Sequence, residues 1–463
     1  MRVATLAVAA AAWAALAAAA PLGAQEDTIR ADPPPPPADT LVLQEALSTA
    51  LHRNPDVRSA RADASAEHAA RWADWGAFLP DASASASFSR SRRTTFSFEQ
   101  PEGTPEEREV AVTSEVHGVS QGLNFQWNLL EGGRRFAELE AGGDRARAAE
   151  LQLSAAERQT VAEVKAAYYQ ALQAQRLRAI ARRQLRSRRE ELERARQRFR
   201  LAAIDRSDLL GTEGQVREAE LQLLEARDQA RSTLRDLGVA MGTPERLDER
   251  IALGDPPPPP DASRLVADSL VGRAMEGHPE LGALEARISA ASADVWGERS
   301  SYLPTISLNY STDRSERLGP EGQFFNFDPR NSSNTFSLSA SWQIFTGFQR
   351  REQNARMSAT RDRRRAERAR RRLEIERTVR DLTAEVKRRQ RRLRILERRL
   401  EVAQERLRLT EERFRRGSVP FVELQNAIQE LTQAERRLVQ ERFAYLGAWA
   451  RLERWTGDLG GGV

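Results

Sequence analysis

The sequence predicts a mainly helical protein in which long antiparallel helical hairpins form a tunnel wall and four strands per chain join a membrane β-barrel. Two stretches of about 67 residues, 133–199 and 348–414, carry a nearly unbroken helix pattern. At about 1.5 Å per residue, each would be a rod of roughly 100 Å. Four shorter stretches alternate apolar and polar residues, as strands do. The second half of the sequence also repeats the pattern of the first half, which indicates a tandem duplication.

Composition excludes several classes of site. Among 463 residues there are 72 basic and 67 acidic side chains, so the formal charge of +5 is mild. The absence of cysteine excludes disulfides, thiolate metal sites and cysteine nucleophiles. Four scattered histidines show no metal-ligand spacing. We therefore expect no metal and no cofactor, and the lack of a catalytic constellation argues against an enzyme.

The N-terminus resembles a secretory signal over residues 1–24. Arg2 precedes an alanine-rich apolar run that ends before the small residue Ala24. A retained membrane anchor is the alternative, since the run is long enough to compete with one. No later stretch has 18 consecutive apolar residues, so we expect an exported protein without a transmembrane helix.

Two proline runs separate the segments of the chain. They fall in a proline-rich segment, 25–40, and in a linker, 255–263. The repeats are expected at 41–254 and 264–457, with a short tail at 458–463. Phe78 to Pro80 matches Tyr302 to Pro304 at a shift of 224, whereas later matches have a shift of 215.

The alternating stretches lie at 82–89, 123–129, 306–311 and 336–344. Apolar-out and polar-in alternation is typical of membrane barrel strands, although a half-buried soluble hairpin is the alternative. The aromatic residues expected to face lipid are Phe125, Trp127, Tyr310, Phe336 and Trp342. Four strands cannot close a barrel that spans a bilayer, because open edges are not tolerated in lipid. Three copies would supply twelve strands.

The helices are punctuated by proline and glycine. Short helices are expected to end at Asn54-Pro55 and His278-Pro279, followed by helices over 56–78 and 280–302 that stop at Pro80 and Pro304. The junctions that restart the long helices contain Gly132, Gly133 and Gly347. Return helices are expected over 207–241 and 422–455, so that each pair of shorter helices can lie alongside one long helix.

Two sequence patterns mark the second long helix. A seven-residue repeat predicts supercoiling near its end. The repeat consists of Val379, Val386, Leu393, Leu400, Leu407 and Phe414. Arginine runs such as Arg363–Arg365 are interpreted as a solvated helix face rather than a nucleic-acid arm, because glutamates are interspersed among them. We expect no nucleic-acid partner.

With these features, the sequence resembles the TolC-like outer-membrane efflux protein family, also called outer-membrane factors. The resemblance extends from about Leu41 to Gly457 and rests on the duplication and on the junctions at Pro80, Pro304, Gly132 and Gly347. Its most diagnostic part is the turn motif from Arg413 to Leu424, which is echoed at 198–209.

The resemblance implies a homotrimer with a twelve-stranded barrel in the lipid of the outer membrane and a periplasmic tunnel of helices. Its tips would contact a periplasmic adaptor (membrane fusion) protein, linked to an inner-membrane pump of RND or ABC type. The chain would be the passive duct of a tripartite efflux or type I secretion system. The cargo (drug, metal ion or polypeptide), the pump and the resting state of the gate stay open.

The resemblance also implies a gate at the hairpin tips. The residues assigned to it are Phe199, Asp208, Phe414, Gly417, Val419, Glu423 and Asn426. Glu423 matches the first position of an acidic ring, while Asn426 stands at the second. Phe414 and Val419 replace a tyrosine and an arginine that latch the tip in other members, so closure is expected to use other contacts, such as Arg415 or Arg416 with Glu423. Ala202 is the counterpart of Gly417 in the first half, so the two turns are not expected to be equivalent.

A different class of function stays open on the sequence alone. The long helices and alternating stretches would also fit a soluble periplasmic coiled-coil scaffold or adaptor-like protein with a small sheet. The location and the oligomeric state of the protein distinguish this alternative from a membrane duct.

Overall fold

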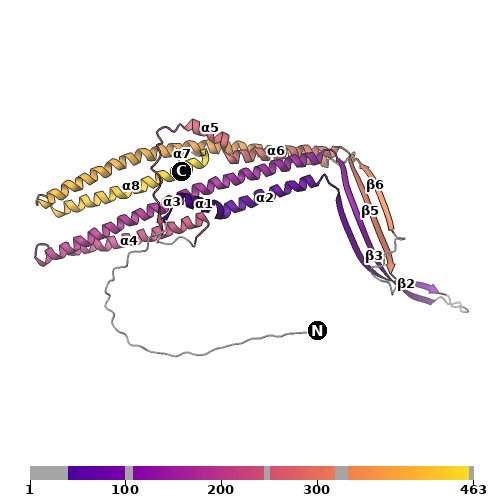
Figure 1. Cartoon of the computed structure of the whole chain (residues 1–463), viewed down its shortest axis with the longest axis horizontal. Coiled ribbons are helices and arrows are strands. Elements are labelled where there is room, and N and C mark those ends of the chain that lie inside the picture. Colours follow the sequence, from indigo (N-terminus) through magenta and orange to yellow (C-terminus); the bar gives the residue numbers. More distant parts are fainter. Residues whose placement is uncertain (1–39, 100–107, 245–250, 319–331, 458–463) are drawn as a thin grey trace, which may run out of the picture.

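A computed structural model describes residues 40–99, 108–244, 251–318 and 332–457. The expected signal peptide, most of the proline-rich segment and the C-terminal tail lie outside these ranges. Figure 1 shows a long helical bundle with a sheet at one end and two hairpin tips at the other.

The element order repeats in the two halves. The first half contains β1 (Thr40–Leu41), α1 (Leu43–Arg53), α2 (Pro55–Gly76), β2 (Asp81–Glu99), β3 (Arg108–Glu131), α3 (Arg134–Arg200) and α4 (Arg206–Met241). The second contains β4 (Ala252–Leu253), α5 (Ala267–Gly277), α6 (Pro279–Arg299), a 3₁₀ turn (Ser300–Tyr302), β5 (Thr305–Leu318), β6 (Ser332–Ser341), α7 (Gln349–Arg415) and α8 (Phe421–Thr456).

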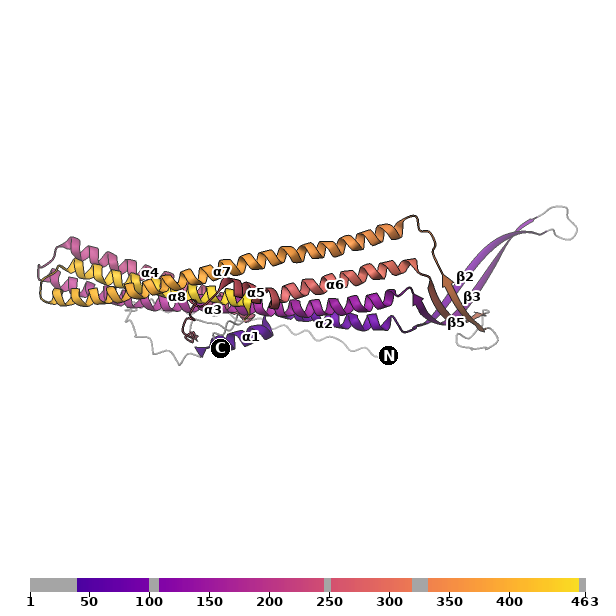
Figure 2. The same cartoon turned by 90° about the horizontal axis from the view of Figure 1, so that it is seen from above.

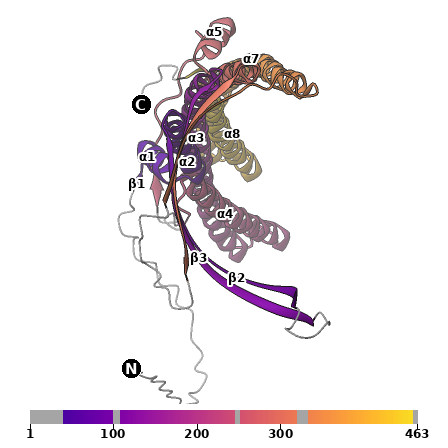
Figure 3. The same cartoon turned by 90° about the vertical axis from the view of Figure 1, so that its right-hand side faces the viewer.

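The two long helices have the expected length, 67 residues each. In Figure 1, α2 and α4 follow one another along α3, and α6 and α8 follow one another along α7. The four-helix wall that results is curved, as the end-on view in Figure 3 shows. Each half therefore supplies two parallel rails, as the helix lengths predicted.

Each long helix begins with two successive residues at positive φ. In the first half these are Gly132 and Gly133, at 59° and 94°. In the second half they are Gly347 and Phe348, at 60° and 68°. Positive φ is unfavourable for a phenylalanine, so Phe348 is a strained copy of Gly133. Glycine was expected at this junction in both halves, whereas the strain at Phe348 has no signal in the sequence.

Two tryptophans tie the strands to the helices that precede them. The indole Nε1 of Trp127 donates to the carbonyl oxygen of Phe78 at 3.0 Å, and that of Trp342 donates to Tyr302 at 3.0 Å. The expectation that the strand over 336–344 includes Trp342 is wrong, because β6 ends at Ser341. After Ser341 the chain leaves the ladder and approaches the turn at Gly347.

The four long strands form one antiparallel sheet in the order β2-β3-β5-β6. The register aligns Ala82, Phe125, Tyr310 and Phe336 in one row, so the apolar residues of all four strands share a face. Strands β2 and β3 have 19 and 24 residues, longer than the alternating stretches expected at 82–89 and 123–129. Figure 2 shows their hairpin extending beyond β5 and β6.

The core is concentrated midway along the bundle. One cluster joins α1, α3, α4 and α8 around Tyr168 and Leu237, and another joins α5, α7 and α8 around Ile375 and Leu452. The phenol of Tyr168 donates to the carbonyl oxygens of Leu41 and Gly254, which fixes the short β1–β4 pair against α3. Between this zone and the sheet, α3 packs on α6 through small residues.

The heptad of α7 is only partly buried. Val379 and Val386 are fully buried and Leu393 nearly so, whereas Leu400 and Leu407 are half-buried. Toward the tip, the buried positions of α7 are instead Ala403 and Thr410. The predicted heptad positions are thus buried in the first half of the repeat. Near the tip, the buried residues lie three positions after the heptad residues.

The arginine-rich face of α7 is extensively paired with acidic residues. Arg371 contacts Glu280 of α6, and Arg380 lies 2.9 Å from Asp268 of α5. This pattern agrees with a solvated, ion-paired face. None of the helices in the described ranges is long and apolar enough to cross a membrane.

Candidate functional site at the hairpin tips

The two tips are closed by the same turn. At the second tip, Gly417 has a φ of 74° and Ser418 N donates to the carbonyl oxygen of Arg413 at 3.0 Å. At the first, Ala202 has a φ of 54° and Ala203 N donates to Arg198 at 2.9 Å. The expectation that the two turns differ is wrong, because the hydrogen bonds that end the helix hold alanine in the left-handed conformation as well.

A groove with a volume of about 740 Å³ separates the two tips. Its walls come from the last turns of α3 and α7 and the first turns of α4 and α8. The charged residues that line it are Glu191, Arg194, Arg198, Asp208, Glu411 and Arg415, and the large apolar ones are Ile204, Phe414, Phe421, Val422, Leu424 and Ile428. A groove lined by both apolar and charged side chains suits an amphipathic partner helix.

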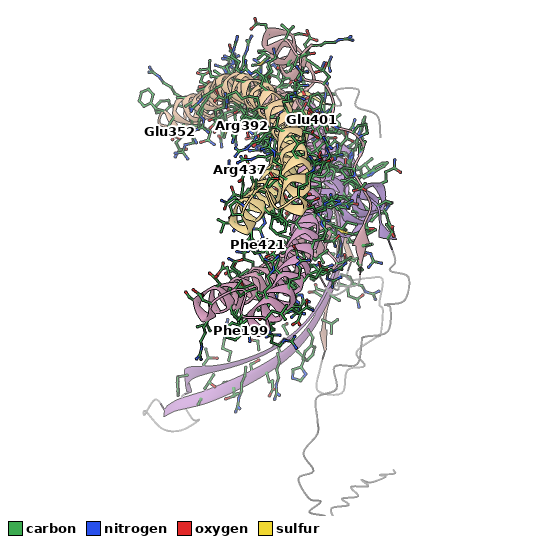
Figure 4. All side chains as sticks on the ribbon, turned by 90° about the vertical axis from the view of Figure 1, so that its left-hand side faces the viewer. Phe199, Glu352, Arg392, Glu401, Phe421 and Arg437 are labelled. Carbon is green, nitrogen blue, oxygen red and sulfur yellow. The ribbon has the colours of Figure 1, made fainter. Side chains whose placement is uncertain are left out.

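Phe421 connects the two hairpins across this groove. The guanidinium carbon of Arg198 lies 5.8 Å from the centre of its ring, and the ring of Phe414 lies 5.9 Å away. Figure 4 shows Phe421 on the second hairpin, with Phe199 on the first. Phe421 was not among the tip residues expected from the sequence. Its equivalent in the first half is Arg206, so the duplication gave no signal.

A buried ion pair lies directly behind the groove. The guanidinium of Arg188 is 2.6 Å from Glu191, with side-chain exposures of 6% and 1%, and it also donates to Gln215 of α4 at 2.9 Å. The second carboxylate oxygen of Glu191 has no hydrogen-bond partner among the described residues. Removal of one partner would leave a buried charge, which is strongly destabilising.

Polar contacts also hold α8 against the first hairpin. Arg436 donates to Gln184 of α3 at 3.0 Å and to Gln222 of α4 at 3.1 Å. One position earlier, Glu435 accepts from Arg183 at 3.2 Å. These hydrogen bonds supplement the packing of the buried Ala434 and help to hold α8 against the first hairpin.

The selected tip residues divide into separate locations. Asp208 and Phe414 line the groove, while Gly417 and Val419 form the turn beside it and Phe199 is exposed at the end of α3. Their proximity to the tips was anticipated; their division between groove, turn and outer surface was not.

Glu423 and Asn426 lie on another face of α8, outside the groove lining. Together with Arg437 they form an exposed stripe, and Figure 4 places Arg437 on the concave side of the wall. The expected ion pair of Glu423 with Arg415 or Arg416 does not form within the described chain. Arg416 lies instead 3.8 Å from Glu412, one turn back on its own helix.

At the opposite end, the five selected sheet aromatics are all substantially exposed, with Phe336 at 70% and Trp342 at 62%. Within the ranges that the structure covers, no group of histidine and acidic side chains could hold a metal ion. The two ends of the molecule thus differ in character: one is an aromatic, apolar sheet face and the other is a charged groove.

The chain matches the family model described as outer membrane efflux protein over residues 46–243 and 270–458. It is similar to Protein CyaE of Bordetella pertussis, with 30% identity over 344 residues, 71% of this chain and 66% of CyaE. It is also 28% identical over 181 residues to alkaline protease secretion protein AprF of Pseudomonas aeruginosa, 39% of this chain and 37% of AprF. The alignments therefore span slightly less than two thirds of CyaE and just over a third of AprF.

Solved structures show the same fold. The Campylobacter jejuni outer membrane channel CmeC superposes with a TM-score of 0.72 at 16% identity, over 90% of this chain and 85% of that one. The likeness extends over the helical wall and the sheet together.

Proposed function

Because this chain belongs to the outer membrane efflux protein family, we propose that it is the outer-membrane duct of an export system, acting as a passive conduit rather than an enzyme. The observation that supports this most directly is the continuity of the two parts. A sheet with one apolar face continues directly into a helical wall of roughly 100 Å. The chain passes from helix to strand at Pro80 and Pro304, and it enters the long helices at Gly132 and Gly347.

The sheet supports a trimer. Strands β2 and β6 are its outer strands, and each lacks a neighbour on one side within the described chain. Unpaired strand edges are not tolerated in lipid, so β2 of one copy would pair with β6 of the next. Three copies close a twelve-stranded barrel, a size found in bacterial outer membranes.

The curvature of the wall supports a tunnel. In Figure 3 the helices follow an arc, and three such arcs placed around an axis would enclose a continuous lumen. The repeats 41–254 and 264–457 would each supply two of the twelve rails, and residues 1–24 would direct export and be removed. The stripe that contains Glu423 and Asn426 would face the lumen and line its entrance.

The tips would form the gate and the contact with a periplasmic adaptor. The groove around Phe421 offers a lining of apolar and charged side chains, and Gly417 and Val419 lie beside it. An inner-membrane pump of RND or ABC type would act through the adaptor. The similarity to AprF, which is named as a secretion protein, favours a secreted polypeptide as the cargo.

The test uses the full-length protein purified from outer membranes. We expect a trimer that dissociates on heating and gives discrete conductance steps in planar bilayers. A soluble monomer without conductance would support the coiled-coil scaffold instead and overturn the duct.

A further inference from the structure

We propose that a basic patch on the lipid-facing side of strand β2, formed by Arg90 and Arg92, binds phosphorylated headgroups of lipids in the outer leaflet. The inference rests on the proposed membrane orientation of the sheet and adds a lipid ligand to it. It starts from the register of the sheet, which determines the face on which each side chain lies.

The two faces of β2 have opposite character. Ala82, Ala84, Ala86 and Phe88 alternate with serines and pair with the apolar face of β3. Arg90 and Arg92 continue this same apolar face, because side chains repeat every two residues along a strand. Arg93 belongs to the opposite face, which carries the serines.

Arg90 follows the last residue of the apolar run that starts near the helices, Phe88; one further exposed phenylalanine, Phe96, lies on this face beyond Arg92. Trp127 lies at the helix end of this run, and the cross-strand partner of Arg90 is His117, ten residues away along β3 (127 − 117). At about 3.4 Å per residue and a tilt of about 40°, ten residues rise by roughly 26 Å. This matches the roughly 25 Å band of outer-membrane barrels, so Arg90 would lie at the level of the headgroups.

The charges at this level favour an anion. Arg90 contacts Glu115, which is also 3.2 Å from His117, and the Arg90 side chain is still 64% exposed. Arg92 is exposed and makes no ion pair with the part of the chain that the structure describes. Two guanidiniums therefore oppose one carboxylate. Arginine suits phosphate because its planar fork can donate two hydrogen bonds at once.

A headgroup fits this patch better than a dissolved anion. The patch adjoins an apolar surface that acyl chains would cover, with Phe88 on the row below Arg90. A phosphorylated lipid can therefore satisfy both regions at once, whereas inorganic phosphate contacts the arginines alone. Each arginine near a membrane surface contributes about 1 kcal/mol to the binding of anionic lipid, or about five-fold in affinity.

The test measures binding of diphosphoryl lipid A to the detergent-solubilised full-length protein by native mass spectrometry. Arg90→Ser and Arg92→Ser should each weaken binding about five-fold, and the double variant about 25-fold. Arg93→Ser is the matched control, since it removes the same charge from the other face, and should bind as the wild type does. Glu115→Gln should tighten binding, because it removes the only described carboxylate of the patch.

Several outcomes would overturn the assignment. One is an equal loss in the Arg93→Ser and Arg92→Ser variants, and another is weaker binding by Glu115→Gln. Full competition by millimolar inorganic phosphate, or equal binding of a dephosphorylated lipid, would also contradict it. Conductance of each preparation is recorded in parallel: conducting trimers without selective binding refute the patch alone, whereas a wild-type protein that neither inserts nor conducts refutes the duct and the patch together.

Discussion

His278 should make the stability of the bundle sensitive to acid. Its side chain is 6% exposed and stacks on Trp455, with ring centres 5.1 Å apart. Burial lowers the pKa of His278 to about 4; Glu280 of α6 opposes the shift, whereas Arg371 of α7, Arg158 of α3 and Arg454 of α8 reinforce it. The imidazole is therefore neutral in the folded protein at neutral pH, and its Nδ1 has no hydrogen-bond partner among the described residues.

The direction and size of the effect follow from proton linkage. An unfolded histidine has a pKa of about 6.5, so below that pH the unfolded chain takes up a proton that the folded chain refuses. Stability is fully present above pH 6.5 and is lost as the pH falls toward about 4. The difference between the two pKa values corresponds to about 2–3 kcal/mol per chain, after allowance for solvent screening.

The chain supplies its own control for this effect. The equivalent residue in the first half is Asn54, whose Oδ1 accepts from the backbone N of Asp56 at 2.8 Å and caps α2. We expect His278→Asn to cap α6 in the same way and to remove the acid sensitivity. Urea unfolding followed by helical circular dichroism at pH 7 and pH 4 should show a loss about 2–3 kcal/mol larger for the wild type. An equal loss in both proteins would refute the reasoning.

Three further predictions concern the gate, the tip turns and the junctions. Arg436→Ala should raise the open probability in planar bilayers several-fold, because it removes two hydrogen bonds from α8; an unchanged open probability would contradict this. Gly417→Ala should cost about 1 kcal/mol and Ala202→Gly should stabilise by a similar amount, because both positions have positive φ; shifts of the urea midpoint in the same direction would argue against it. Trp127→Phe and Trp342→Phe should each cost about 1 kcal/mol through one lost hydrogen bond, seen as a lower dissociation temperature on heating, and unchanged temperatures would show that these bonds are weak.

Much of the architecture could be predicted because it depends on local chemistry. Proline before a strand and glycine before a helix are local signals, so the junctions at Pro80 and Gly132 were identified correctly. The seven-residue spacing correctly predicted that Val379 and Val386 are buried. The lengths of the helices then determined that the shorter ones lie alongside the long ones.

The features that the sequence could not predict depend on contacts between distant segments. Arg188 and Glu191 resemble any exposed pair at i,i+3, and only the packing of α4 shows that they are buried. The positive φ of Ala202 and Phe348 is imposed by the turns around them. The outer ends of β2 and β3 were also missed, although Phe96 and Phe98 flank Ser97 and Val110 and Val112 flank Ala111, because these short alternations are separated from the longer ones by charged and polar residues.

The groove shows the same limit for the candidate site. Phe414 was selected from the resemblance. Phe421 belongs to the site because its ring contacts Phe414 and the guanidinium of Arg198 on the other hairpin. A residue whose role is to bridge two hairpins has no signature within its own helix. The duplication gives no help at that position, since Arg206 stands there in the first half.

The most direct test of the central claim exploits the absence of cysteine from the chain. Single cysteines placed at Ala84 and Ser85 would lie on opposite faces of β2. In outer membrane vesicles, a membrane-impermeant thiol reagent should label Ser85→Cys, which faces the aqueous lumen, and leave Ala84→Cys unmodified in lipid. Equal labelling of the two positions would contradict a sheet that spans the membrane with its apolar face toward lipid.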